Sequence, residues 1–505
     1  MSILPIIIIL PLLAALVSWF GKKNTEVIEG ATVLSGILSL GIAFNILYTA
    51  ATGGLAGASK LLLLPYLSVD GLGAYVLAIA ALFYAASSLY AVGALRIEVA
   101  SGFLEENRRP VFYLMFNLFA AALFTATMAA SPILMWIAIE ATTLATVFCI
   151  NYYKLPASTE AAWKYLIISS LALLLSLFGT LLFLLATKGH VNGIATWNDL
   201  MNLAPSLSPA LIQLAGVLVF IGFGTKIGLV PLHTWKPDAY SRAPIAIVAL
   251  FSTGLLNVAI LALLRFKMVV DASIGVAFMQ NLFIFFGALA IVVAALIILT
   301  QKKLRRLLAY HSIEHAGIII IGFGFGGIAA FGALLHMLYY TTAKAILFFG
   351  AGIAQMKYRT HRVEYIKDMI NILPVTSVTF AIGALALIGL PPFGLFTSEI
   401  YIFGSGFSTH PVVAIIGILG VALVFIGMLY KLHLILFGEA VTNPRLTSAL
   451  GEELHGTTLR DRIKGEFSSW TTVPVVVLVI ILIITGVTMP TQLVQLLSGA
   501  AGIIQ

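Results

Sequence analysis

A lysine interrupts one of the apolar segments of this sequence, at a position where a membrane-crossing helix would be dry. Lys226 directly follows the apolar run 211–220 and is surrounded by glycines and by Pro231. A charge in hydrocarbon costs about 2.5–3.5 kcal/mol on insertion scales, so it is rarely retained without a function. Because Gly228 and Pro231 disfavour a continuous helix, we predict a broken helix that lines an ion or substrate site. The alternative is a lysine that extends to the membrane interface.

An acid lies at comparable depth in an earlier apolar segment. Glu140 is roughly nine residues, or about 13 Å along a helix, into segment 131–153. A carboxylate at that depth needs a cation or a proton, and Lys226 is the natural candidate partner. The alternative is a protonated glutamate that is hydrogen-bonded to a neighbouring helix. The first half of the chain is thus predicted to bury an acid and an amine together.

The second half repeats this arrangement of a buried amine and an acid beside a helix break. His336 and Lys344 are eight residues apart, which places them within about 80° on one face of a helix. Pro391 and Pro392 interrupt a later apolar segment, and Glu399 follows shortly afterwards. Burial favours the neutral forms of both lysine and glutamate, so that protons can be exchanged near neutral pH. We therefore predict a relay of ionisable groups that moves protons.

The pattern H-x-x-E-H at His311, Glu314 and His315 matches an inverted zinc-protease motif. Such a site also needs a third ligand and an accessible cleft for its substrate. No suitably spaced acid follows, and the motif lies about one turn inside an apolar segment. We predict no metal site and no catalytic centre here, but a polar cluster that feeds protons inward. A membrane metalloprotease is the alternative.

Further polar residues complete the predicted relay. His233 follows the first break on the side predicted to be cytoplasmic, and Lys431 and His433 end the apolar segment 412–438. Asn257 is uncharged, but its amide can hold a water or pass on a hydrogen bond. Alternatively, Asn257 only joins two helices.

Composition assigns the chain to the polytopic membrane proteins. Of its 505 residues, 61% are hydrophobic and 10% are charged. One cysteine, Cys149, excludes an internal disulfide and any cluster held by several cysteines of this chain. We therefore expect no cofactor on this chain, so that any redox centre lies on another subunit.

Fourteen apolar spans are predicted, most of them long enough to cross about 30 Å of hydrocarbon. The fold class is therefore all-α. The spans cover residues 2–20, 30–50, 68–94, 110–129, 131–153, 165–187, 209–231, 244–264, 275–300, 307–325, 327–355, 373–408, 412–438 and 472–497. The first span lacks a basic leader and a cleavage site, and is interpreted as a retained helix.

The net charge of +8 follows the membrane topology rather than a nucleic-acid surface. Of the 28 Lys and Arg residues, 21 fall in loops after odd-numbered spans and four, including Lys60, in loops after even-numbered spans. By the positive-inside rule the odd loops are cytoplasmic, so both termini are predicted to lie outside the cell membrane. No nucleic-acid partner is expected.

The two broken spans, numbers 7 and 12, are five spans apart and suggest two inverted five-helix repeats. We assign the repeats to residues 110–268 and 269–440. Residues 1–109 form the three preceding helices, whose spans (residues 1–94) are predicted to bury no charge except Asp70. The loop from Arg96 to Arg109 is interpreted as a solvated face or a partner contact. Residues 441–505 form a polar cytoplasmic segment and a final helix.

The ordered set of motifs resembles one family closely. It comprises Glu140, Lys226 with Pro231, His233, Trp235 and Pro237, Ala243-Pro244, Lys344 after His336, and Glu399 after Gly-x-Pro-Pro. This set resembles the antiporter-like subunits of respiratory complex I, subunits A and D of multisubunit sodium/proton antiporters and the large membrane subunits of energy-converting hydrogenases. Tyr310-His-Ser-Ile-Glu, Asn257 and Ser398-Glu399 look like the branch of archaeal membrane-bound hydrogenases, similar to their H subunit.

The resemblance implies an ion-translocating subunit of a redox-driven complex. Its partners would be other membrane subunits and, through them, peripheral subunits with nickel–iron or iron–sulfur centres; the ion would be H⁺ or Na⁺. In this family the glutamate of span 5 pairs with the lysine of span 7, and buried lysines conduct protons laterally. Many members carry lysine or histidine near the position of Asn257, so the relay here would run through water or His336. The alternatives are a stand-alone sodium/proton antiporter subunit and a scaffold bundle.

Overall fold

The computed structural model describes residues 4–22, 24–53, 66–191, 193–450 and 456–504. Apart from two isolated β-bridges, these residues form helices joined by short connections. Residues 1–3 of the predicted unit 1–109 and residue 505 of the predicted unit 441–505 lie outside the described residues. So does Lys60, one of the basic residues used to predict the topology.

The first half of the chain supplies three leading helices and the five spans of the first predicted repeat. The leading helices are α1 (Leu4–Phe20), α2 (Thr25–Ala51) and α3 (Gly71–Ala100). The next spans are α4 (Arg109–Thr127), α5 (Pro132–Ile150), α6 (Pro156–Ala186), α8 (Pro209–Ile227) with α9 (Trp235–Arg242), and α10 (Ile245–Leu250) with α11 (Leu256–Ile274). The short α7 (Trp197–Leu203) lies in the connection before α8.

The second half follows the same order of long and broken spans. It contains α12 (Ala277–Thr300), α13 (Leu304–Phe325), α14 (Gly327–Tyr358), α16 (Pro374–Leu387) with α17 (Gly394–Thr409), and α18 (Pro411–Phe437). The short α15 (Met369–Ile372) precedes α16, and α19 (Pro444–Leu450) and α20 (Gly456–Ile463) follow α18. The chain continues with α21 (Ser469–Val487) and α22 (Thr491–Ile504).

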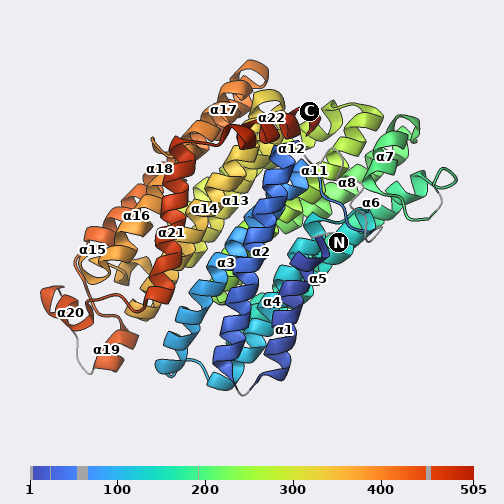
Figure 1. Cartoon of the computed structure of the whole chain (residues 1–505). Coiled ribbons are helices and arrows are strands. Elements are labelled where there is room, and N and C mark those ends of the chain that lie inside the picture. The colour runs from blue at the N-terminus through green and yellow to red at the C-terminus, as the bar shows by residue number, and fades with distance from the viewer. Residues whose placement is uncertain (1–3, 23, 54–65, 192, 451–455, 505) are drawn as a thin grey trace.

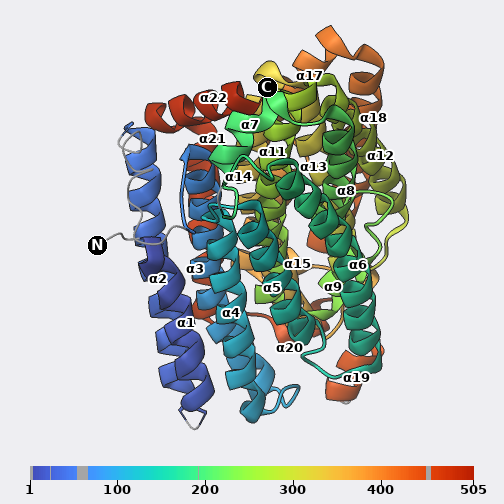
Figure 2. The same cartoon turned by 90° about the vertical axis from the view of Figure 1, so that its right-hand side faces the viewer.

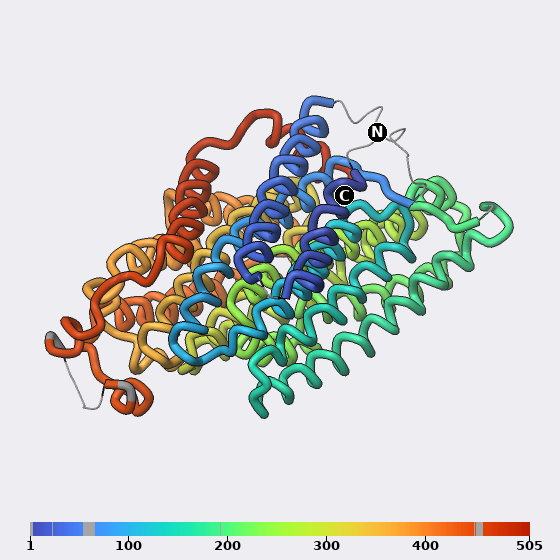
Figure 3. Tube along the Cα trace, turned by 60° about the horizontal axis from the view of Figure 1, so that its bottom comes forward, coloured from blue at the N-terminus to red at the C-terminus, as the bar shows by residue number. Residues whose placement is uncertain are grey.

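The helices form one bundle in which the fourteen predicted spans are all present (Figures 1 and 2). Twelve of the helices are long and apolar enough to cross a membrane, and shorter apolar helices supply the remaining crossings. The blue-to-green first half and the yellow-to-orange second half occupy adjoining regions (Figure 3). The helix α21 returns to pack against both α3 and α14. The prediction of a polytopic all-α membrane protein is therefore confirmed.

The last predicted span is too long. Its helix α21 ends at Val487, and Pro490 precedes a separate helix, α22. Proline cannot continue the hydrogen-bond ladder of a helix, so the chain turns at this point. Figures 1 and 2 show α22 lying across the end of the bundle, where it packs against α2, α3, α11 and α14.

Both spans predicted to be broken are broken. In the first, α8 ends at Gly228, whose φ of 93° is left-handed and favours glycine. In the second, α16 is followed by Gly389, with φ 70°, and by the two prolines before α17. A third irregularity, the π-helix at residues 251–255, interrupts the span that contains Asn257. Such single-turn insertions are frequent at functional sites.

The most polar spans lie deepest in the bundle. The helices α13 and α14, which carry the histidines and Lys344, are buried along almost their whole length. The helices α6 and α18 expose large apolar side chains such as Phe178 and Val412. Apolar side chains on the outside suit a lipid environment, so the ionisable groups are enclosed by a hydrocarbon-compatible shell.

Basic residues from separate connections meet at one end of the bundle. Backbone hydrogen bonds and a β-bridge join the segment before α13 to the connection after α14. Burial, together with the nearby cations Lys303 and Arg305, lowers the pKa of His361 in this connection to about 4. Two loops predicted to be cytoplasmic are therefore neighbours in space.

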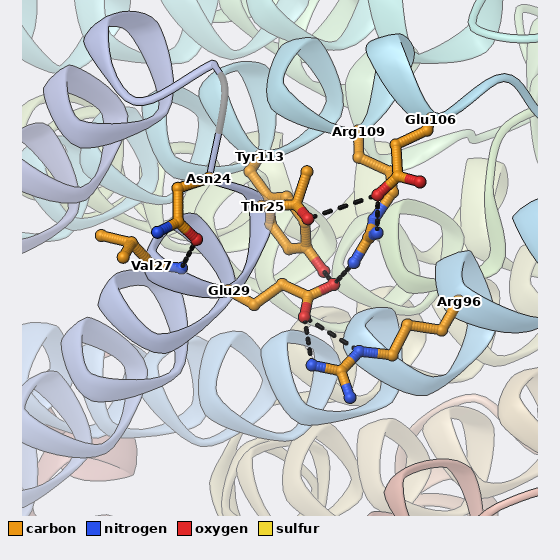
Figure 4. A network of polar contacts seen from close by, with 8 residues as sticks. All are labelled: Asn24, Thr25, Val27, Glu29, Arg96, Glu106, Arg109 and Tyr113. Carbon is orange, nitrogen blue, oxygen red and sulfur yellow. Dashed lines mark hydrogen bonds and ion pairs between the residues drawn. The ribbon is translucent and has the colours of Figure 1, made fainter.

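The leading helices contain a buried charge that we did not predict. Glu29 of α2 is only 3% exposed and forms ion pairs with Arg96 of α3 and Arg109 of α4 (Figure 4). Tyr113 lies 3.4 Å from the same carboxylate. The prediction that spans 1–3 bury no charge except Asp70 is wrong for both residues. The helix α2 begins five residues earlier than predicted and includes Glu29, whereas the side chain of Asp70 is 52% exposed. Arg96 and Arg109 accordingly connect helices and do not belong to a solvated loop.

The substitution Glu29→Ala is expected to destabilise the leading helices. It leaves Arg109, with a side chain 7% exposed, without its buried partner. Breaking a buried pair by removing one member costs about 3–5 kcal/mol. We expect a clearly lower melting temperature in detergent. The matched control is Glu105→Ala, because Glu105 pairs with Arg108 at the surface and such pairs contribute little. Equal melting temperatures for the two variants would contradict a structural role of Glu29.

Candidate functional site

Lys226 occupies the last turn of α8, where its side chain is buried. Its ammonium donates hydrogen bonds to the hydroxyl of Thr143 at 2.7 Å and to that of Tyr165 at 2.9 Å. The C-terminal end of a helix carries a partial negative charge, which stabilises a cation in the last turn. The break in this span therefore creates a helix end inside the bundle and places Lys226 at it.

Glu140 is connected to Lys226 through a hydroxyl group. Thr143, one turn further along α5, donates to Oε2 of Glu140 at 3.2 Å, and Ser170 of α6 donates to Oε1 at 3.1 Å. Lys226 was the predicted partner of Glu140, and the hydroxyl of Thr143 bridges the two. A hydroxyl can accept one hydrogen bond while it donates another. The order of groups from amine to hydroxyl to carboxylate is therefore suited to passing a proton.

Aromatic packing fixes this first cluster in place. The ring of Tyr165 lies 4.9 Å below the Lys226 ammonium and packs against Trp235 with a centroid distance of 5.0 Å. Trp235, at the start of α9, also donates from its indole to the carbonyl oxygen of Thr225 at 3.0 Å. The two halves of the broken span and α6 are thus held together around the lysine.

A second cluster joins three helices of the other half. Nδ1 of His315 on α13 lies 2.9 Å from Nε2 of His336 on α14. The other ring nitrogen of His336 lies 2.9 Å from the hydroxyl of Ser398 on α17. Glu399, the next residue, is buried beside the second break. An imidazole can take up a proton at one nitrogen and release it from the other, so His315, His336 and Ser398 form a continuous hydrogen-bonded path that ends beside Glu399.

The remaining members of the second cluster are also buried. Nδ1 of His311 lies 3.0 Å from the carboxylate of Glu314. Within the described part of the chain, the ammonium of Lys344 and the side-chain amide of Asn257 have no hydrogen-bond partner. Buried polar groups normally have a partner in protein or water. Lys344 and Asn257 are therefore positions where water or a transferred proton can be accommodated.

The histidines and acids of the second cluster lie closer together in the structure than their spacing in the sequence indicated. Ligand atoms of His311, Glu314 and His315 lie within 4.8 Å of one another, as do those of His315, His336 and Glu399. The cavity between α3 and α13 is lined by other residues, such as Glu98 and Arg305. The ring nitrogens that join His315 to His336 bind each other, an arrangement suited to proton transfer. The absence of a metal stays a prediction.

Three predicted relay residues lie apart from these clusters. Lys431 donates to the carbonyl oxygens of Ile298 and Leu299, at the end of α12. His433 is exposed on α18 and packs against Phe437. His233 lies in the connection between α8 and α9, with Nδ1 3.2 Å from the carbonyl oxygen of Pro231. The structure brings none of these three into hydrogen-bond contact with the two clusters.

Several residues of the clusters were missed by sequence reasoning. Thr143 could have been found, because it follows Glu140 by three residues and so shares its helix face. Ser170, Tyr165 and Ser398 reach the clusters from other helices, and no local spacing indicates such contacts. Lys236 was assigned to a cytoplasmic loop, but it lies in α9 and is only 1% exposed.

Comparisons with known proteins identify the family of this chain. The transmembrane family described as NADH:quinone oxidoreductase/Mrp antiporter matches residues 129–427. The hydrogenase-4 component F homolog of Methylacidiphilum infernorum is 37% identical over 310 residues, which cover 61% of this chain and 65% of that relative, slightly less than two thirds of its length.

Two solved structures share the fold over nearly the whole chain. A chain of the membrane-bound sulfane sulfur reductase, an archaeal respiratory membrane complex, has a TM-score of 0.85 at 21% identity and covers 99% of this chain and 97% of its own. A chain of the Mrp complex from a Dietzia species has a TM-score of 0.81 at 19% identity, with the same coverage. At these identities the likeness concerns the fold alone.

Purified protein is expected to contain no stoichiometric zinc at the His311–Glu314–His315 group. The reason is that Nδ1 of His315 is used in a hydrogen bond to His336 on the neighbouring helix and that the group is fully buried. Metal content measured by mass spectrometry should be the same in wild type and in His315→Gln. One zinc per chain that is lost in His315→Gln would reverse this prediction and reopen the metalloprotease alternative.

Proposed function

Because the chain belongs to the NADH:quinone oxidoreductase/Mrp antiporter transmembrane family, we propose that it translocates ions as the antiporter-like membrane subunit of a redox-driven complex. The branch we favour is the membrane-bound hydrogenase type, in line with the hydrogenase-4 relative. The proposed ion is H⁺, with Na⁺ as a further cargo. The observation that carries the proposal is the contact sequence that leads from the buried Lys226, at a helix end inside the bundle, through Thr143 to Glu140.

The first cluster supports exchange of a proton between Lys226 and Glu140. When the amine donates to Thr143 and the hydroxyl donates to Glu140, one proton can move along the pair of hydrogen bonds. The step leaves a neutral amine and a neutral carboxylic acid, so no isolated charge remains in a medium that solvates charge poorly. Return of the proton restores both charges. A change in the field at Glu140 would therefore alter the proton affinity of Lys226.

The second cluster supports transfer across three helices. A proton that arrives at His315 can leave from the far nitrogen of His336 toward Ser398, beside Glu399. Glu314 and Lys344 lie in the same buried region and provide an acid and an amine. The proposed relay thus has an acid and an amine in each half. In the first half the amine Lys226 lies at a helix break, and in the second half the acid Glu399 lies next to one.

The chain is proposed to act together with other subunits. Glu140 is partly exposed on the surface of this chain, between the exposed side chains of Ile137 and Leu144. A partly exposed acid on an apolar surface fits contact with a neighbouring membrane subunit. Nickel–iron or iron–sulfur centres are proposed for peripheral partner subunits, since the single cysteine of this chain is buried. The proposed location is the cell membrane, with both termini outside.

Substitutions at Lys226 separate proton transfer from ion pairing. We expect Lys226→Ala to abolish coupled ion movement and Lys226→Arg to reduce it at least tenfold. Arginine keeps the charge, but its pKa above about 12 prevents release of the proton. The measurement is ΔpH or sodium uptake in proteoliposomes driven by the electron donor of the complex, with assembly checked by native gel. Wild-type pumping by the arginine variant would reduce Lys226 to a fixed counter-charge.

A stand-alone sodium/proton antiporter is the second candidate function. The family description favours it, because that family includes the Mrp antiporter as well as NADH:quinone oxidoreductase. The subunits that co-purify with the chain distinguish the two candidates. Redox subunits with nickel or iron–sulfur centres would support the proposed function. A set of small membrane subunits without redox centres would support the antiporter.

A further inference from the structure

Lys236 is a buried lysine that the relay described above does not use. It lies in the first turn of α9, directly after the break in span 7, and is 1% exposed. Its ammonium donates to the carbonyl oxygen of Ile227 on α8 at 2.8 Å and to that of Ser312 on α13 at 3.4 Å. The ring of Tyr240 lies 5.7 Å from the same ammonium. Lys236 therefore contacts both halves of the chain.

The first break is shaped around Lys236 in the way that the second is shaped around Glu399. A Cβ added at Gly228 would lie 2.7 Å from Cδ of Lys236, so a larger residue would exclude the lysine. A Cβ added at Gly389 would collide with the carboxylate of Glu399. Both glycines are left-handed, and both make room for an ionisable side chain of the half-helix that follows. Lys236 thus occupies at the first break the position that Glu399, an acid of the proposed relay, occupies at the second.

Capping of α8 is the simpler role for Lys236, but it leaves two observations unexplained. The last carbonyl oxygens of a helix lack partners within the helix, and Lys236 satisfies that of Ile227. A neutral donor would do the same without the cost of burying a charge, as the indole of Trp235 does for Thr225. Capping also gives no reason for the contact with Ser312, which belongs to the other half of the chain.

The position of Lys236 lies between the two clusters. Ser312 adjoins His311 and is two residues from Glu314. Toward the first cluster, Lys236 lies at the same helix break as Lys226. Its ammonium donates a hydrogen bond to the carbonyl oxygen of Ile227, the residue after Lys226. The side-chain amide of Asn257, a further residue of the predicted relay, cannot bind and release a proton as an amine does.

We propose that Lys236 carries protons between the Lys226 cluster and the His311–Glu314–Lys344 cluster. The inference rests on the proposed function and adds one residue to it. In the step considered, the ammonium of Lys236 gives one proton to the carboxylate of Glu314, which leaves a neutral amine and a neutral carboxylic acid. The neutral amine of Lys236 then takes a proton from the ammonium of Lys226, which becomes neutral in turn.

The test compares four substitutions at Lys236 in the assembled complex. Glutamine keeps a donor for the Ile227 carbonyl, arginine keeps donor and charge, and methionine keeps only volume. We expect all three to lower ion translocation in proteoliposomes at least tenfold, because none can release and rebind a proton. Lys236→His is expected to retain part of the rate. Its rate maximum should move to lower pH, since imidazole binds a proton at lower pH than an amine does.

Two reference variants make each outcome decisive. Lys267→Gln is the matched control, because Lys267 is buried but pairs with Asp271 and donates to the carbonyl oxygen of Ile504 at the end of the bundle. This variant leaves the Asp271 carboxylate, 7% exposed, without its partner, so we expect a lower melting temperature, but the assembled variant should pump normally. If Lys236→Gln and Lys236→Arg pump at the wild-type rate while Lys226→Ala is inactive, Lys236 only caps α8 and the proposed function stands. If Lys226→Ala also pumps normally, the proposed function itself fails. An unassembled Lys236→Met leaves the decision to the glutamine, arginine and histidine variants.

Discussion

The cost of a charge or an unpaired carbonyl group in hydrocarbon determines how this protein is built. A helix satisfies its own backbone, so a continuous span offers no polar group to an ion. Each broken span exposes helix-end carbonyl groups inside the bundle, and these must find donors. At the first break the donors are Trp235 and Lys236, and the same helix end stabilises the charge of Lys226. The breaks are thus the places where this chain can keep ionisable residues at depth.

The arrangement of the other helices follows from the same constraint. The helices α13 and α14 carry histidines, an acid and a lysine, and they can do so only because neighbouring helices enclose them. Helices such as α6 and α18 present apolar side chains outward and contribute few charges. The leading helices repeat the principle on a smaller scale, since Glu29 is buried only together with Arg96 and Arg109. In the leading helices, burial and pairing of charge therefore occur together.

The sequence was sufficient to predict the spans, both breaks and most of the buried ionisable residues. Runs of apolar residues report membrane crossings directly, and glycine or proline beside a charge reports a break. Errors arose where a boundary or a partner on another helix mattered. Glu29 was placed in a loop because it precedes the apolar run, and the bend before α22 was missed because the residues beyond Pro490 are also apolar. Ser170, Tyr165 and Ser398 act across helices, and only the packing brings them to the clusters.

Lys236 illustrates why counting charges by loop has a physical limit. Counting by hydropathy assigns a lysine next to a break to the cytoplasmic connection, because the apolar run ends there. The fold instead turns α9 back into the bundle, so that the side chain enters the space left by Gly228. The same geometry recurs at Gly389 and Glu399, where an acid fills the space. The first break thus admits a lysine, which is charged when it holds a proton. The second break admits a glutamate, which is charged when it has lost its proton. A relay that passes through both breaks can therefore move a proton without leaving an uncompensated charge between them.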